Sequence, residues 1–160
     1  LSSIGKQAFL KCFALTEIDL PDALDSIYAA SFGHCTSLYR VRIGAGVKTI
    51  DSFAFENCTK LESIELTGNV TSVAKSAFSG CTGLKTVVIG KNVESISAGA
   101  FEGCTGIKKI KFLHSADDMP RILIGFNPEL DGAEVVYEES ESEDYNAPKK
   151  YFKTGEITLW

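Results

Sequence analysis

Cysteine is the residue type whose spacing first suggests chemistry in this chain, because paired thiols form disulfides and clustered thiols bind zinc. The five cysteines recur every 23 residues, so each occupies the same position of a repeated unit. Their number is odd, and parallel side chains that all point inward have the wrong mutual aim for a disulfide. A zinc site needs converging ligands of the C-x-x-C type, and the sequence has no such pair. We therefore predict reduced, buried thiols, each a small apolar group with a weak S–H donor, at Cys12, Cys35, Cys58, Cys81 and Cys104.

The other residues that could do chemistry do not form a recognisable site, and zinc or redox chemistry at the cysteines is the alternative to a structural role. The two histidines, His34 and His114, fall at different positions of the repeat, and His34 is placed as a turn residue. No G-x-S-x-G nucleophile motif is present, and the glycines recur with the repeat, as expected of turn residues. We predict that the chain is not an enzyme and has no cofactor and no metal.

The elements that must position these residues repeat with the same period. Each unit opens with V-x-x-I, continues with A-F-x-x-C and ends with L-x-x-I-x-L, and five units align without a gap over residues 1–115. A fixed period of this size predicts a solenoid, in which each unit contacts only its neighbours. One unit offers too few apolar positions to offset the entropy of ordering 23 residues, so the units must stack in order to fold.

Local patterns within the unit predict its backbone. The L-x-x-I-x-L phrase ends in an apolar/polar alternation, which predicts a short strand and, by stacking, a parallel sheet. The V-x-x-I phrase predicts a second inward-facing edge, and the A-F-x-x-C phrase a single short helical turn on the back. The residue before each cysteine is expected to be left-handed, although Lys11 suits that conformation poorly; these residues are Lys11, His34, Asn57, Gly80 and Gly103.

This pattern resembles the leucine-rich repeats of the BspA-like type, also called the Treponema pallidum type. The resemblance implies an α/β repeat solenoid: a right-handed superhelix with a parallel concave sheet and short helical turns on the back. It also implies a cell-surface or secreted protein that acts in adhesion by binding protein or glycan ligands. It supplies no catalytic residues.

The remainder of the chain is predicted to close the array. Residues 116–137 read as a degenerate sixth repeat, and residues 138–160 as an acidic loop plus a C-terminal cap, with a hairpin around Thr154 and Gly155 covering the open sheet. We expect the amide of Asn127 to satisfy the turn backbone that a cysteine lines elsewhere. The 23-residue register places five residues on the Ile, Phe, Cys, Leu and last strand positions, in order Met119, Ile124, Asn127, Leu130 and Val135.

The outward strand positions carry the charges that could bind a ligand. The register places Glu17 opposite Arg40, and Arg42 opposite both Asp19 and Glu65. One interpretation is that these pairs set register and solubility, and the other is that the sheet is a ligand platform, because Tyr and Arg anchor many interfaces. The lysines of this face suit an acidic partner or the acidic run of the chain itself. The candidate ligand-binding residues are Tyr39, Arg40, Arg42, Glu65, Lys85, Lys108, Lys109 and Lys111.

The net charge and the length of the apolar runs limit which partners and which compartment we expect for the chain. The net charge of −5 argues against nucleic acid as a partner, and no apolar run approaches the roughly 20 residues of a membrane-spanning helix. The chain begins within a repeat without a signal segment, so we expect a mature or cloned fragment.

Three functions compete: a surface-exposed or secreted binding module, a rigid spacer within a larger surface protein, and an accessory domain of an enzyme.

Overall fold

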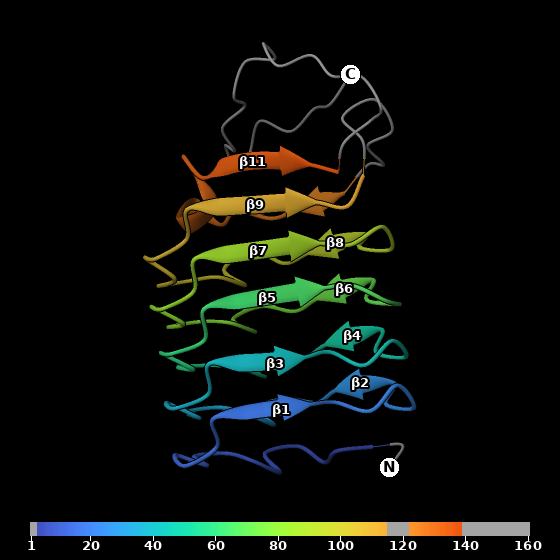
Figure 1. The fold of residues 1–160 in the computed structure, drawn as a ribbon, viewed down its shortest axis with the longest axis vertical. Helices are drawn as coiled ribbons and strands as arrows, with labels where there is room; N and C mark the ends of the chain where they lie inside the picture. Colours follow the sequence, from blue (N-terminus) through green and yellow to red (C-terminus); the bar gives the residue numbers. More distant parts are fainter. Residues whose placement is uncertain (1–2, 115–121, 139–160) are drawn as a thin grey trace.

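The computed structural model describes residues 3–114 and 122–138. These residues form a solenoid in which successive units stack as parallel coils (Figure 1). The predictions for Met119, for the acidic run beyond Glu138 and for the C-terminal hairpin lie outside the described residues.

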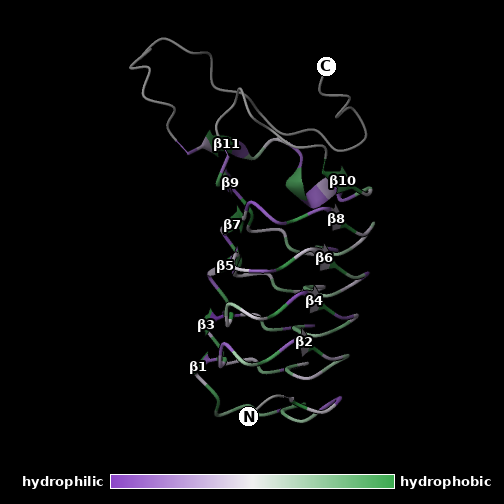
Figure 2. Ribbon diagram, turned by 90° about the vertical axis from the view of Figure 1, so that its right-hand side faces the viewer, coloured by the Kyte–Doolittle hydropathy of each residue, from purple (hydrophilic) through white to green (hydrophobic). Residues whose placement is uncertain are grey.

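Among the described residues, the coils contribute six strands to a front column and five to a back column, and Figure 2 shows the two columns on opposite sides of the stack. Every pairing of the described strands is parallel, as predicted for the front column. The front column comprises a two-stranded sheet and a four-stranded sheet. Its strands are β1 (Glu17–Asp19), β3 (Arg40–Arg42), β5 (Ser63–Leu66), β7 (Thr86–Ile89), β9 (Lys109–Phe112) and β11 (Glu134–Tyr137).

The V-x-x-I phrase, predicted only as an inward-facing edge, forms a second parallel sheet of five strands. Its two-residue strands each bury the second residue in the middle coils, because that residue points into the stack. The strands of this back column are β2 (Ser26–Ile27), β4 (Thr49–Ile50), β6 (Ser72–Val73), β8 (Ser95–Ile96) and β10 (Leu123–Ile124).

The predicted helical turns on the back are wrong. The described residues contain no α-helix, and their single helical element is the short 3-10 turn Pro128–Leu130. In each A-F-x-x-C segment, alternate N–H groups leave the coil: the N–H of Phe78 donates to Ala100 of the next coil at 2.9 Å, whereas the N–H of Cys81 donates to Phe78 at 3.1 Å. Bonding between coils thus replaces the i→i−4 pattern of an α-helix.

In each unit, two residues with a left-handed backbone conformation account for this path of the chain, because a positive φ breaks a right-handed helix. The prediction for the residue before each cysteine is confirmed at all five positions, including Lys11 at φ 60°. The second left-handed position was not predicted. It lies two residues before each repeated phenylalanine, at Gln7, Ala30, Phe53, Ser76 and Gly99.

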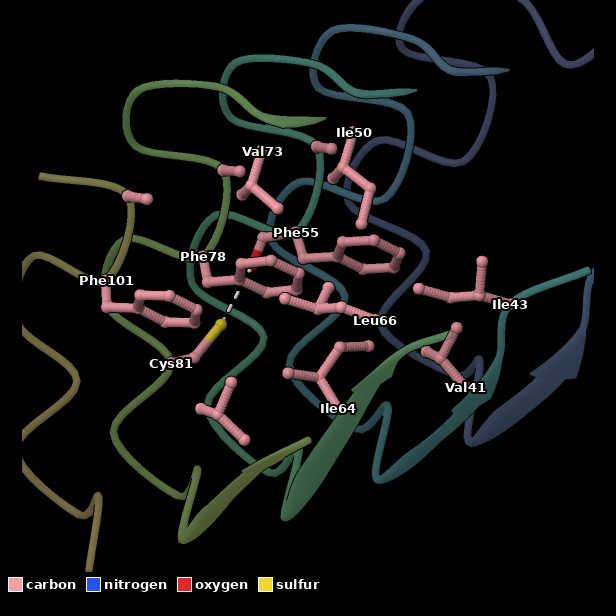
Figure 3. Packing of buried hydrophobic residues seen from close by; sticks show 14 of the residues in the cluster. Val41, Ile43, Ile50, Phe55, Ile64, Leu66, Val73, Phe78, Cys81 and Phe101 are labelled. Carbon is pink, nitrogen blue, oxygen red and sulfur yellow. Dashed lines mark hydrogen bonds between the residues drawn. The ribbon is translucent and has the colours of Figure 1, made fainter. Parts of the chain in front are cut away.

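The core consists of ladders of identical side chains. Neighbouring phenylalanine rings stack at 5.1–5.3 Å between centroids and within 7° of parallel (Figure 3). All five cysteines are free, as predicted, and all but Cys12 are buried. Each buried thiol donates to the phenylalanine carbonyl of the preceding coil, for example Cys58 Sγ to Phe32 O at 3.2 Å. Burial raises the pKa of Cys35 to about 12, so its thiol stays protonated at neutral pH.

The predicted register of the sixth unit is wrong. Ile124 pairs with Ile96, so it occupies an Ile position of the back sheet and not the Phe position. Val135 pairs with Ile110, and Tyr137, not Val135, takes the last strand position opposite Phe112. The spacing is 28 residues (124 − 96) in the back sheet and 25 residues (135 − 110) in the front sheet. Asn127 and Leu130 are buried in this coil.

Candidate functional site

The outward side of the front column, called here the front face, presents all eight candidate ligand-binding residues. Strand alternation aims every second side chain away from the core, as the exposed–buried–exposed pattern of β3 shows. Five of the candidates lie on β3, β5 or β9, and three directly precede β3, β7 or β9. All eight are exposed: Tyr39, Arg40, Arg42, Glu65, Lys85, Lys108, Lys109 and Lys111.

Near the N-terminal end of the front face, polar side chains already bind one another. The guanidinium of Arg40 donates through Nε to Glu17 Oε2 at 3.1 Å and through Nη1 to Asp19 Oδ1 at 2.8 Å. The hydroxyl of Tyr39 donates to the same Glu17 oxygen at 3.2 Å. These bonds, that to Glu17 foremost, raise the pKa of Arg40 above its usual range.

Arg42 completes this group in a way that the sequence did not predict. It stands opposite Asp19 in the register, as predicted, but its Nη1 donates to Asp22 at 3.1 Å and its Nη2 to the Leu20 carbonyl at 3.2 Å. The Ala45 N–H and then Arg42 hold the pKa of Asp22 below its ordinary value. We refer to Glu17, Asp19, Asp22, Tyr39, Arg40 and Arg42 as the paired cluster.

The front column is interrupted next to the paired cluster. β3 belongs to the two-stranded sheet and β5 to the four-stranded sheet. Val41 of β3 and Ile43, which directly follows β3, are 8% and 7% exposed, whereas Ile64 and Leu66 of β5 are fully buried. Arg42 reaches back toward the preceding coil, and no ion pair joins it to Glu65, which the structure also describes. The predicted cross-strand relation between Arg42 and Glu65 is therefore not realised as a pair.

Beyond the interruption, the front face carries a group of lysines that we call the lysine patch: Lys85, Lys108, Lys109 and Lys111. Lys85 Nζ lies 3.5 Å from Glu62 Oε1. No ion pair joins the other three lysines to another residue of the described ranges. In the register, Lys109 stands between Thr86 and Glu134, and Lys111 between Val88 and Val136. The two halves of the front face thus differ in how far their charges are compensated.

The positions of the two histidines give little support for a catalytic or metal-binding role. His34 is a turn residue, as predicted, with φ 59° and its Nε2 3.5 Å from Glu56 Oε2. His114 is buried, with its Nε2 3.3 Å from the Lys91 carbonyl and its Nδ1 without a partner. Within residues 3–114 and 122–138, no three His, Cys, Asp or Glu side chains lie close enough together to hold a metal ion.

A groove of about 530 Å³ lies beside the loops that lead into the back strands. Its lining mixes amines, amides, a hydroxyl and a carboxylate and contains no aromatic ring, so it lacks the flat apolar platform of a typical ligand pocket. Lys91 in its wall is paired with Glu138 at 3.1 Å. The groove is lined by Lys48, Asn69, Thr71, Lys91, Asn92, Val93 and Glu94.

The described part of the chain has no helix with the length and apolarity needed to cross a bilayer.

Three solved structures are similar to the fold of this chain. The T. pallidum leucine-rich repeat protein is 28% identical, with a TM-score of 0.67 over 69% of this chain and 52% of its own. The pneumococcal vaccine antigen PcpA is 18% identical, with a TM-score of 0.68 over 87% of this chain and 40% of its own. A leucine-rich cell surface protein of Faecalibacterium prausnitzii is 21% identical, with a TM-score of 0.52 over 86% and 51%.

The chain spans about half the length of the T. pallidum and F. prausnitzii structures and less of PcpA. No curated protein sequence is significantly similar to it. The model of the BspA type leucine-rich repeat region matches residues 2–122 in six copies. With the coil-by-coil stacking described above, this match establishes that the chain belongs to the BspA type leucine-rich repeat family.

Proposed function

We propose that this chain is a non-catalytic binding module that recognises a protein or glycan ligand through its front face. The observation that carries the proposal is the presentation of exposed polar side chains from a column of parallel strands. Hydrogen bonds between the strands hold the backbone beneath these side chains, so little order has to be gained on binding. A surface of this kind suits the recognition of a ligand.

The proposed location is the cell surface or the extracellular space, and the proposed role is adhesion. Two of the structural relatives are named as a vaccine antigen and as a cell surface protein. The second candidate is a rigid spacer within a larger surface protein, favoured by the ladders that tie every coil to the next and by the greater length of the relatives.

Binding of the full chain to immobilised extracellular matrix proteins and to a glycan array tests the proposal. Two front-face variants, Arg40→Ala/Arg42→Ala and Lys109→Ala/Lys111→Ala, each remove two cations. The matched control, Lys6→Ala/Lys75→Ala, removes two exposed cations at equivalent positions outside the front face. We expect a bound protein or glycan to be lost with at least one front-face variant and retained with the control. Binding that survives both front-face variants would remove this face from consideration, and a chain that binds nothing would favour the spacer.

A further inference from the structure

The front face offers two sets of cations, and three of the four lysines of the lysine patch are available to a partner without breaking an ion pair within the described residues. Arg40 makes two ion pairs, and Arg42 makes an ion pair and a carbonyl hydrogen bond. A ligand carboxylate must compete with these contacts before it can bind either guanidinium. Lys108, Lys109 and Lys111 have no ion-pair partner among the described residues. Because exposed ammonium groups are hydrated but otherwise uncommitted, an anionic ligand gains new charge pairs there.

The spacing of the lysine patch matches an extended polypeptide. Lys109 and Lys111 are alternate residues of β9 and point to the same side, so their Cα atoms are roughly 7 Å apart. Alternate residues of an extended peptide repeat at the same distance. Lys85 and Lys108 occupy equivalent positions of neighbouring coils, roughly 5 Å apart across the sheet. Carboxylates at every second position of an extended segment can therefore meet Lys109 and Lys111 together.

The surroundings of the patch favour a polypeptide over a nucleic acid. Val88 and Val136 stand on either side of Lys111 in the register, and both are half-buried. They offer small apolar surfaces to the methylene groups of a peptide. The chain carries a net charge of −5, and Glu62 and Glu134 border the patch, so the continuous charge of a phosphate backbone is disfavoured.

From these observations we infer that the lysine patch binds an acidic segment of a partner protein in extended conformation, with alternate carboxylates on Lys109 and Lys111. This inference rests on the proposed function and narrows it to one half of the front face and one class of partner. The paired cluster then stabilises its own coils and does not hold the acidic ligand.

Fluorescence anisotropy with a labelled synthetic peptide of six Glu-Ser repeats tests the inference on the full chain. A peptide of the same composition with all its glutamates in one block is the control ligand. The variant Lys109→Glu/Lys111→Glu reverses the charge of the patch, and Lys109→Gln/Lys111→Gln removes it more mildly. Arg40→Gln/Arg42→Gln removes two cations from the other half of the front face, and Lys6→Gln/Lys75→Gln, outside that face, is the matched control. Unchanged circular dichroism and thermal midpoints establish that each variant is folded.

We expect the alternating peptide to bind more tightly than the block peptide, with an affinity that falls as salt is raised. Charge reversal should weaken binding at least tenfold and the Lys109→Gln/Lys111→Gln variant several-fold. The arginine variant and the Lys6→Gln/Lys75→Gln control should each weaken it less than twofold. Equal losses in the lysine and arginine variants, equal binding of both peptides, or no binding at all would overturn the inference. Tighter binding of heparin or of single-stranded DNA would also overturn it, because the partner class would be wrong. A surface ligand lost with the arginine variant alone would leave the proposed function standing while the lysine assignment fails.

Discussion

The side-chain oxygen of Asn127 accepts a hydrogen bond from the backbone N–H of Phe101 at 3.1 Å. In the preceding coil, the N–H of Phe78 donates instead to the carbonyl of Ala100 in the next coil. Asn127 therefore supplies from one side chain what a further coil supplies elsewhere. Glu129 acts in the same way, because its Oε1 accepts from the N–H of Gly103 at 2.9 Å. Two side chains thus accept hydrogen bonds from backbone N–H groups on the back of the last regular coil.

Replacing Asn127 should destabilise the fold more than an ordinary polar substitution. Its amide group also donates to the carbonyls of Ser97 and Gly125. Asn127→Ala therefore leaves the Phe101 N–H and the Gly125 carbonyl without this partner, whereas the Ser97 carbonyl keeps its bond from the Ala100 N–H. Because buried unsatisfied groups cost about 1–3 kcal/mol each, we expect a loss of about 2 kcal/mol or more in the free energy of unfolding. Urea denaturation measures it. The control Asn92→Ala, which removes one exposed amide contact to Gly68, should cost less than about 1 kcal/mol.

Truncation of the phenylalanine ladder should cost most in its middle. Phe55 is fully buried between Phe32 and Phe78, whereas Phe9 stacks on Phe32 alone and is half-buried. We expect Phe55→Ala to lower the free energy of unfolding by about 3–5 kcal/mol and Phe9→Ala to lower it by clearly less. Equal losses in urea denaturation would contradict the nearest-neighbour account of the stack.

The energetic cost of the left-handed backbone at the second position can be measured where an added side chain meets no steric obstacle. Gly99 has φ +69°, and a Cβ added there meets no atom nearer than 3.8 Å, so Gly99→Ala reports on the backbone conformation. We expect a loss of about 1 kcal/mol in thermal or urea denaturation. Phe53 holds the equivalent position at φ 62° with its side chain 44% exposed. Phe53→Gly should therefore be neutral or stabilising, and a large loss there would show that the ring matters more than the backbone.

Cys12 should be the one thiol that reacts in the folded protein. It is half-buried at the N-terminal end of the ladder, whereas Cys35, Cys58, Cys81 and Cys104 are fully buried. A thiol-specific chromogenic reagent should titrate about one thiol per folded chain and all of them after denaturation. Cys12→Ser should abolish the reaction of the folded state. Rapid reaction of a second thiol would indicate that the coils open locally.

Alkaline pH should unfold the protein through the buried thiols. Burial raises the pKa of Cys35 to about 12, whereas the same thiol in an unfolded chain ionises near pH 8.5–9. The folded state therefore keeps a proton that the unfolded state loses, and stability falls as pH rises from about 9 to about 12. Cys35 alone contributes on the order of 1 kcal/mol per pH unit in that window. Contacts with the Cys104 and Cys58 thiols, together with burial, raise the pKa of Cys81, which adds in the same direction.

Urea midpoints measured at several pH values from 8 to 11 check this expectation. Cys35→Ala should lower stability at every pH because it leaves a cavity, but its stability should fall less steeply above pH 9. An unchanged slope would mean that other groups cause the alkaline loss.

The sequence alone determined the stack and its ladders. When the same residue returns every 23 positions, the surroundings of one unit repeat in the next, so Phe32, Phe55 and Phe78 must share one environment. That argument predicted the parallel strands, the buried thiols, the left-handed residue before each cysteine and the exposed face that carries the candidate site. Each of these features depends on short-range pattern and on translation by one coil.

Only the tertiary structure decided the features for which contacts between neighbouring coils have more than one possible arrangement. Ala30 and Phe53 adopt a left-handed backbone although they carry no local signal for it, and their segments donate N–H groups to the next coil, which excludes the predicted helical turns. A long arginine side chain can reach several carboxylates, so the preference of Arg42 for Asp22 depends on the position of the turn between the coils. The closing of the stack by Asn127 likewise follows from contacts made after a change of register, which a fixed period cannot anticipate.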